Sequence, residues 1–194
     1  MGLGLFYRWL FIGMWLAWFG YWWIAAHNVK ATVKVESAVS RRSHMLPLFI
    51  ALSLVCWPTF PVPGLREYVL PGQYWRIWAA VGAVLTAAGL FFAIWARVKL
   101  GRNWSGEITV KESHELTTGG PYSLVRHPIY TGLLLAMLGT ALARGQVQGF
   151  LGVAVACITL WRKLRIEERF MGEEFGAQYA EYRKRVRALI PFVL

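Results

Sequence analysis

Long runs without charged residues dominate the hydropathy pattern of this 194-residue chain. The first run, residues 3–26, contains one charged residue, Arg8. Runs 45–65 and 77–96 contain none, and two shorter runs, 127–143 and 145–161, are separated by a single arginine. Crossing the hydrocarbon core of a bilayer, about 30 Å thick, takes roughly 20 helical residues. The pattern therefore predicts about five spans, with the last two forming a tight helical hairpin.

The apolar runs lack the polar stripe at helical spacing that marks a surface helix of a soluble protein. We therefore predict an all-α fold, a multi-span integral membrane helical bundle with about five transmembrane helices. Four spans with a re-entrant hairpin is the alternative. The chain is expected to form a single membrane domain, 1–194, with spans 1–3 in residues 1–99 and spans 4 and 5 in residues 100–194.

Small residues recur at helical spacing in the third and fourth runs. Small side chains allow helices in a membrane to approach each other closely. We therefore expect these two runs to contact each other or their neighbours through the faces that carry Ala79, Ala83 and Ala87 and then Gly132, Ala136 and Thr140.

The net charge of +11 is concentrated in alternate segments of the chain. All but four of the 21 Lys and Arg residues fall in segments 27–45 and 97–128 or after residue 161. Positive loops of membrane proteins face the cytoplasm. The bias therefore predicts cytoplasmic basic segments beside an anionic lipid bilayer, and it argues against a nucleic-acid partner. Trp residues near the predicted span ends, Trp22 among them, are typical of interface anchors.

Several kinds of chemistry are disfavoured by residues that the sequence lacks. It contains no Asp, no Rossmann GxGxxG and no P-loop motif, and its four His are scattered without metal-ligand spacing. We therefore expect no metal site. The middle of each predicted span also lacks the ionisable groups of proton relays and ion pathways, which argues against a channel or coupled transporter.

The remaining polar residues gather in segments 101–130 and 162–191. In the first, RHPIY places Pro128 at the first turn of a helix, where its missing N–H is tolerated. Arg126, His127 and the backbone N–H groups of that helix end would form an electropositive pocket suited to a carboxylate or phosphate. The simpler interpretation is that Arg126 anchors the chain at the membrane and His127 caps the helix.

In the second segment, Glu167 and Glu168 are neighbours on a predicted helix that continues the fifth span. Adjacent residues point about 100° apart, so the two carboxylates should meet different surroundings. We expect one to face inward and the other to pair with Arg165 or Arg169. A solvated, Arg-paired face is the simpler alternative.

Several fragments, in this order and spacing, resemble the isoprenylcysteine carboxyl methyltransferase family and the related membrane phospholipid N-methyltransferases. The resemblance covers the C-terminal half of the chain and adds little for the first two spans. It rests on LGRNWSG at 100–106, HELTTGGPY at 114–122, RHPIYTG at 126–132, the pair Glu167–Glu168, FGAQYAEYRKRV at 175–186 and LIPF at 189–192.

The resemblance implies that S-adenosylmethionine binds on the cytoplasmic side, between the loop before span 4 and the helix after span 5. Carried over by position, the implied cofactor-binding residues are His114, Glu115, Leu116, Thr117, Tyr122, His127, Pro128, Ile129, Tyr130 and Glu167. The implied catalytic residues are Glu167, Glu168, Lys163 and Arg126. Glu167 is assigned to the cofactor, and Glu168 is expected to orient Arg165 or nearby loop groups.

The expected activity is methyl transfer to a lipidic or hydrophobic acceptor at the membrane interface, with a carboxylate such as that of isoprenylcysteine the leading candidate. The family often has Arg four residues before its cofactor-binding Glu, and this chain has Lys163 there. Lys keeps the charge but not the bidentate fork, which leaves the acceptor's identity open. The alternatives are a phospholipid or small-molecule N- or S-methyltransferase and a membrane NADPH-dependent reductase of the sterol type.

Overall fold

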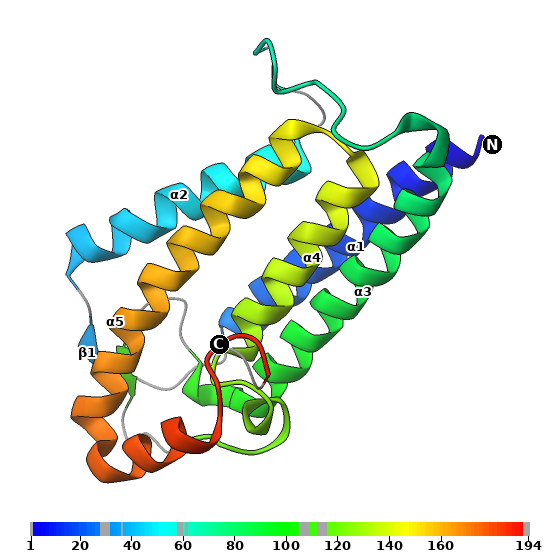
Figure 1. The fold of residues 1–194 in the computed structure, drawn as a ribbon. Coiled ribbons are helices and arrows are strands. Elements are labelled where there is room, and N and C mark those ends of the chain that lie inside the picture. Colours follow the sequence, from blue (N-terminus) through cyan, green and yellow to red (C-terminus); the bar gives the residue numbers. More distant parts are fainter. Residues whose placement is uncertain are drawn as a thin grey trace.

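The computed structural model describes residues 2–27, 32–35, 37–57, 60, 62–104, 109–111 and 116–191. It consists of long helices joined at one end by a small two-stranded sheet (Figure 1). The helices are α1 (Leu3–Ala26), α2 (Ala38–Cys56), α3 (Trp75–Leu100), α4 (Pro128–Arg144) and α5 (Val147–Arg185). Short 3₁₀ turns η1 (Gly72–Tyr74), η2 (Gly101–Asn103) and η3 (Gly120–Ser123) precede or follow them.

The helical fold class is confirmed, and the spans are confirmed in part. Among the described residues, the helical stretches Leu3–Ala26, Gly72–Asn103 and Val147–Arg185 are long and apolar enough to cross a membrane. Helix α4 is apolar but shorter. Helix α2 differs from the run expected at 45–65: it begins at Ala38, includes Arg41 and Arg42, and ends at Cys56.

Helices α4 and α5 form the expected hairpin, with a turn that requires glycine. Gly145 follows α4 with φ of 66°, a left-handed conformation that costs glycine little. The Arg144 side chain donates from Nη1 to the Val55 carbonyl at 2.8 Å and from Nη2 to Gln146 Oε1 at 3.1 Å. This turn is therefore tied to the end of α2.

Helices α3 and α4 lie antiparallel in close backbone contact. Gly82 faces Gly139, and Gly89 faces Gly132, so that a Cβ atom at any of these glycines would meet backbone atoms of the facing helix. Beside them, Thr86 Oγ1 lies 3.2 Å from Thr140 Oγ1. Close contact through small residues replaces the hydrophobic driving force that is weak between helices in lipid.

The expected contact face is confirmed on α4 and wrong on most of α3. Gly132, Ala136 and Thr140 are buried, as predicted. On α3, Ala87 is exposed and Ala83 is half-buried. The buried small residues of α3 are instead Ala79, Gly82, Thr86, Gly89, Ala93 and Ala96. Alanine is frequent around this helix, so spacing alone did not identify the face on which glycines allow contact.

The chain segments that carry most of the basic residues meet at one end of the bundle. Strand β1 (Thr32–Val35), after α1, pairs antiparallel with β2 (Thr109–Lys111), after α3. Arg97, near the end of α3, donates from Nη2 to the Ala25 carbonyl at 2.6 Å. The C-terminal segment lies at the same end (Figure 1). The all-α prediction did not include this small sheet.

Replacing Gly89 with Ala should weaken the α3–α4 contact, because the added methyl must displace the backbone near Gly132 and Ala136. We expect Gly89→Ala to lower the free energy of unfolding by about 1–3 kcal/mol, the usual cost of overpacking. The measurement is the thermal midpoint of the purified protein in detergent.

The matched control is Gly13→Ala in α1, where an added Cβ has no heavy atom within 4 Å. It should leave the midpoint unchanged or raise it slightly, because Ala favours helix over Gly. Equal midpoints for the two variants would contradict the proposed role of the close glycine contact.

Candidate active site

Polypeptide from the C-terminal segment completes the N-terminus of α4. The Arg126 N–H donates to the Arg187 carbonyl at 2.8 Å, and the His127 N–H donates to the Ala188 carbonyl at 3.0 Å. Thr131 Oγ1 donates to the Leu189 carbonyl at 2.7 Å. The backbone N–H groups of Arg126 and His127 are therefore already paired and are not free to bind an external anion.

A break in α5 brings the C-terminal segment to this position. Gly176 has φ of 49°, so the helical path is interrupted there and the following turns fold back beneath the bundle (Figure 1). Tyr179 and Tyr182 on those turns are buried, and Tyr182 Oη donates to the Tyr122 carbonyl at 2.6 Å. This reversal was not predicted from the sequence.

Glu168 forms a buried ion pair with Arg126. Arg126 donates to Glu168 Oε1 from Nε, at 2.8 Å, and also from Nη2, while its Nη1 donates to the Val186 carbonyl. The Arg126 and Glu168 side chains are only 9% and 10% exposed. Arg183 lies 3.5 Å from the other carboxylate oxygen. Glu168 therefore orients a loop residue, which was one of the two expectations, and its partner is Arg126 in place of Arg165 or Arg169.

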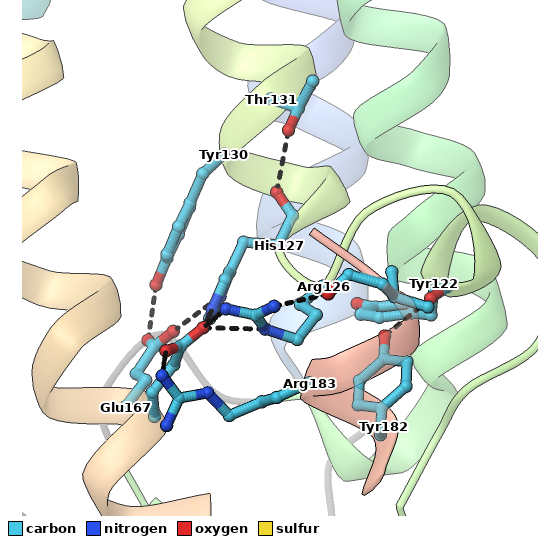
Figure 2. A network of polar contacts seen from close by, with 10 residues as sticks. Tyr122, Arg126, His127, Tyr130, Thr131, Glu167, Tyr182 and Arg183 are labelled. Carbon is cyan, nitrogen blue, oxygen red and sulfur yellow. Dashed lines mark hydrogen bonds and ion pairs between the residues drawn. The ribbon is translucent and has the colours of Figure 1, made fainter. Parts of the chain in front are cut away.

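Glu167 faces a different set of groups, as its 100° offset predicted. Tyr130 Oη donates to Glu167 Oε1, and His127 Nδ1 lies 3.5 Å from Oε2 (Figure 2). Lys163 Nζ lies 3.8 Å from Glu167 Oε1 and 5.6 Å from the centre of the Tyr130 ring. Neither glutamate lies on a solvated face, so that alternative is excluded.

His127 bridges the two carboxylates and stacks parallel to the Tyr130 ring, with centroids 5.6 Å apart. Burial alone would lower the pKa of His127. Hydrogen bonds to Glu167 and Glu168 outweigh burial and raise the pKa above its ordinary value. The protonated ring, with two N–H donors, thus persists to a higher pH than in a free histidine. Burial, and then the charge of Glu167, raise the pKa of Tyr122, which therefore stays protonated.

These groups border a cavity of about 370 Å³. Its polar wall is made by residues of the loop before α4, the start of α4 and the polar part of α5. Its other wall is largely apolar and aromatic and comes from α1, α2 and the membrane parts of α4 and α5. The lining residues on the polar side include Leu116, Thr117, Tyr122, Arg126, His127, Pro128, Ile129, Tyr130, Lys163 and Glu167.

Most of the residues to which the family resemblance assigns a role in binding or catalysis thus line a single cavity. Glu168 is not among the lining residues: it lies behind the polar wall and holds Arg126 and His127. His114 and Glu115 fall outside the described residues. Within the described part of the chain, no group of three or more His, Cys or Glu side chains is arranged to hold a metal ion.

The wall contributed by the first two helices and the end of α3 was not predicted from the sequence. The lining residues there are Trp18, Trp22, Met45, Leu48, Leu100, Asn103 and Trp104. Apart from the motif that contains Asn103 and Trp104, these positions carry no signal that separates them from lipid-facing or anchoring residues. Trp22, expected to be an interface anchor, stacks on Trp18 with ring centroids 4.6 Å apart.

The site is that of a membrane-embedded enzyme with a polar pocket at one end of its helices. A family model described as phospholipid methyltransferase matches residues 77–178, more than half of the chain. The chain therefore belongs to this family, in its isoprenylcysteine carboxyl methyltransferase branch, and is a methyltransferase.

Individual relatives have related names. A probable protein-S-isoprenylcysteine O-methyltransferase of Oryza sativa subsp. indica is 28% identical over 175 residues, which cover 87% of this chain and 86% of that protein. The protein-S-isoprenylcysteine O-methyltransferase of Saccharomyces cerevisiae is 32% identical, over 61% of this chain and 51% of its own. Methanethiol S-methyltransferase 2 of Bradyrhizobium diazoefficiens is 29% identical, over 79% of this chain and 60% of its own.

Glu168→Gln should destabilise the protein, because it leaves the charge of Arg126 buried without its carboxylate. Removing one partner of a buried ion pair costs about 3 kcal/mol or more. We expect a clear drop in the thermal midpoint measured in detergent. The control is Glu181→Gln, whose 57%-exposed side chain pairs with Lys184 on the surface. Such pairs contribute about 0–1 kcal/mol, so equal effects of the two variants would contradict a structural role for Glu168.

Proposed function

We propose that the protein transfers the methyl group of S-adenosylmethionine to a lipidic acceptor at the membrane interface, with the carboxylate of an isoprenylcysteine the favoured acceptor. The observation that supports this proposal is a single cavity with two unlike walls. Glu167, His127 and Tyr130 border one side, and apolar side chains of membrane helices border the other. A polar methyl donor and an apolar acceptor can both be accommodated by such a cavity.

The residues present fit S-adenosylmethionine. A cavity of about 370 Å³ falls within the usual range for small-molecule sites. The cofactor is a cation with a second, ammonium charge, and the Glu167 carboxylate and the surrounding aromatic rings suit such groups. Residues that would hold it are Leu116, Thr117, Tyr122, Glu167 and the stretch 127–130. When bound, the cofactor supplies an electrophilic methyl group on a sulfonium centre.

The chain's own residues would align the reactants and keep water out. Tyr130 and His127 fix the Glu167 carboxylate from two directions, so its orientation is set before a ligand binds. A carboxylate acceptor carries no proton to lose and needs no general base. Lys163, buried in the cavity wall, provides the cation that such an acceptor requires. Aligning the reactants and excluding water both depend on the cavity, and neither requires a covalent intermediate.

The test uses purified protein and labelled cofactor. S-adenosylmethionine, but not NADPH, should bind in calorimetric titration, and N-acetyl-S-farnesylcysteine should gain a base-labile methyl ester. Glu167→Gln keeps the shape and removes the charge, and we expect the dissociation constant of S-adenosylmethionine to rise roughly tenfold or more.

The control is Glu174→Gln, an exposed residue of the same helix, which should bind the cofactor normally. Labelling of a thiol or a phospholipid amine in place of the farnesylcysteine would reject the proposed acceptor but keep the reaction class. Tight NADPH binding without S-adenosylmethionine binding would reject the reaction itself.

We further propose that the cavity faces the cytoplasm, because the basic segments gather at its end of the bundle. Ser123 and Gln73 precede α4 and α3, which are antiparallel, so they lie at opposite ends. In a background with Cys56→Ser and Cys157→Ser, an impermeant thiol reagent on intact cells should label Gln73→Cys and not Ser123→Cys. Permeabilised cells should label both, and the reverse pattern in intact cells would contradict this orientation.

A further inference from the structure

The outer face of α5 changes from apolar to basic along the helix. Leu151 and Ile158, seven residues apart on one side of α5, are 43% and 65% exposed. Arg162, Arg165 and Arg169 follow Ile158 at steps of four, three and four residues, and all three are exposed. Residues at such steps are neighbours on one face of a helix. We call the three arginines the basic stripe, because they continue the apolar face as a row of cations.

The basic stripe lies opposite the face of α5 that borders the candidate active site. Lys163 and Glu167 line the cavity. Arg165 is two residues from each of them, which is about 200° around the helix axis. Ala156 and Leu160, on the same side as Lys163, are buried in the core of the bundle. The basic stripe is therefore directed away from the bundle, while the same turns of helix hold the polar wall of the cavity.

The glutamates nearest to the basic stripe have other partners or lie beyond its end. Glu168 pairs with Arg126 and Arg183, and Glu167 faces the cavity. Glu173 comes one turn after the last arginine of the stripe. Within the part of the chain that the structure describes, no acidic side chain forms an ion pair with any of the three guanidinium groups. Like charges one turn apart destabilise a helix, so an external anion would stabilise this part of α5.

The depth of the basic stripe in the membrane indicates which anion it meets. Helix α5 begins at Val147, and roughly 20 helical residues cross the hydrocarbon core of a bilayer. The change from Ile158 to Arg162 therefore falls near the far edge of that core. Trp161, which is 41% exposed and lies between them, is typical of the membrane interface. Arginine side chains at this depth extend into the headgroup layer, where lipid phosphates are their nearest anions.

We propose that the basic stripe binds the headgroups of anionic phospholipids, of which phosphatidylglycerol is the probe used below. A guanidinium forms two parallel hydrogen bonds with a phosphate. Three guanidinium groups within about 10 Å of helix need more negative charge than a zwitterionic lipid supplies, so the stripe favours lipids with a net negative charge. A bound headgroup holds the turns of α5 whose opposite face carries Lys163 and Glu167. The inference does not depend on the identity of the methyl acceptor.

The experiment compares two double variants of equal charge in micelles of a neutral detergent. Dioleoylphosphatidylglycerol should raise the thermal midpoint of the unmodified protein by about 5 °C more than the same amount of dioleoylphosphatidylcholine. Arg162→Gln with Arg165→Gln should lose most of this difference. Lys184→Gln with Arg185→Gln removes the same charge from exposed side chains that pair with Glu181, and it should keep the difference. Without added lipid, neither variant should unfold at a lower midpoint than the unmodified protein.

Two further additions distinguish a lipid from other anions. Inorganic phosphate and a glutamate-rich peptide, each at the concentration of the lipid, should leave the midpoint of the unmodified protein unchanged. Equal shifts with the two lipids, equal losses in the two double variants, or a shift with inorganic phosphate as large as that with phosphatidylglycerol would overturn the lipid site. A shift with the peptide and none with phosphatidylglycerol would also overturn it, and would assign the basic stripe to an acidic protein partner.

Discussion

The close antiparallel contact between α3 and α4 is the constraint on which the rest of the structure depends. Lipid gives helices little hydrophobic reason to associate, so backbone approach at paired glycines must supply the packing. This contact sets the start of α4, with His127, beside the end of α3, where Asn103 and Trp104 follow. The polar wall and the aromatic wall of the cavity thereby lie at the same end of the helices, although their residues come from different parts of the chain.

Within the site, two adjacent carboxylates have different roles because neighbouring residues on a helix point in different directions. Glu168 is bound to Arg126 and Arg183 behind the wall, and it fixes the loop that enters α4. Glu167 is left facing the cavity, where Tyr130, His127 and Lys163 surround it. One glutamate thus stabilises the fold, and its neighbour remains available to a ligand. A single residue could not meet both demands.

Sequence reasoning found the helical fold, the hairpin of α4 and α5, and the motif residues that meet in the cavity, because ordered motifs and charge-free runs are visible without a structure. It missed what depends on tertiary contact. Nothing in α1 distinguishes Trp18, which borders the cavity, from a tryptophan that anchors a helix at the interface. The reversal at Gly176 and the pairing of Glu168 with Arg126 are likewise set by packing between distant segments, which periodicity does not report.

The carbonyl groups that hold the start of α4 also have a consequence for biosynthesis. Arg126 is bound by Val186, which the ribosome adds 60 residues later, and the neighbouring backbone is held by Arg187 and Ala188. The hydrogen bonds to the backbone before α4 therefore form only after the chain has been made as far as residue 188. These carbonyls follow all five described helices in the chain, so a nascent chain that ends before residue 186 lacks the groups that complete this wall of the pocket.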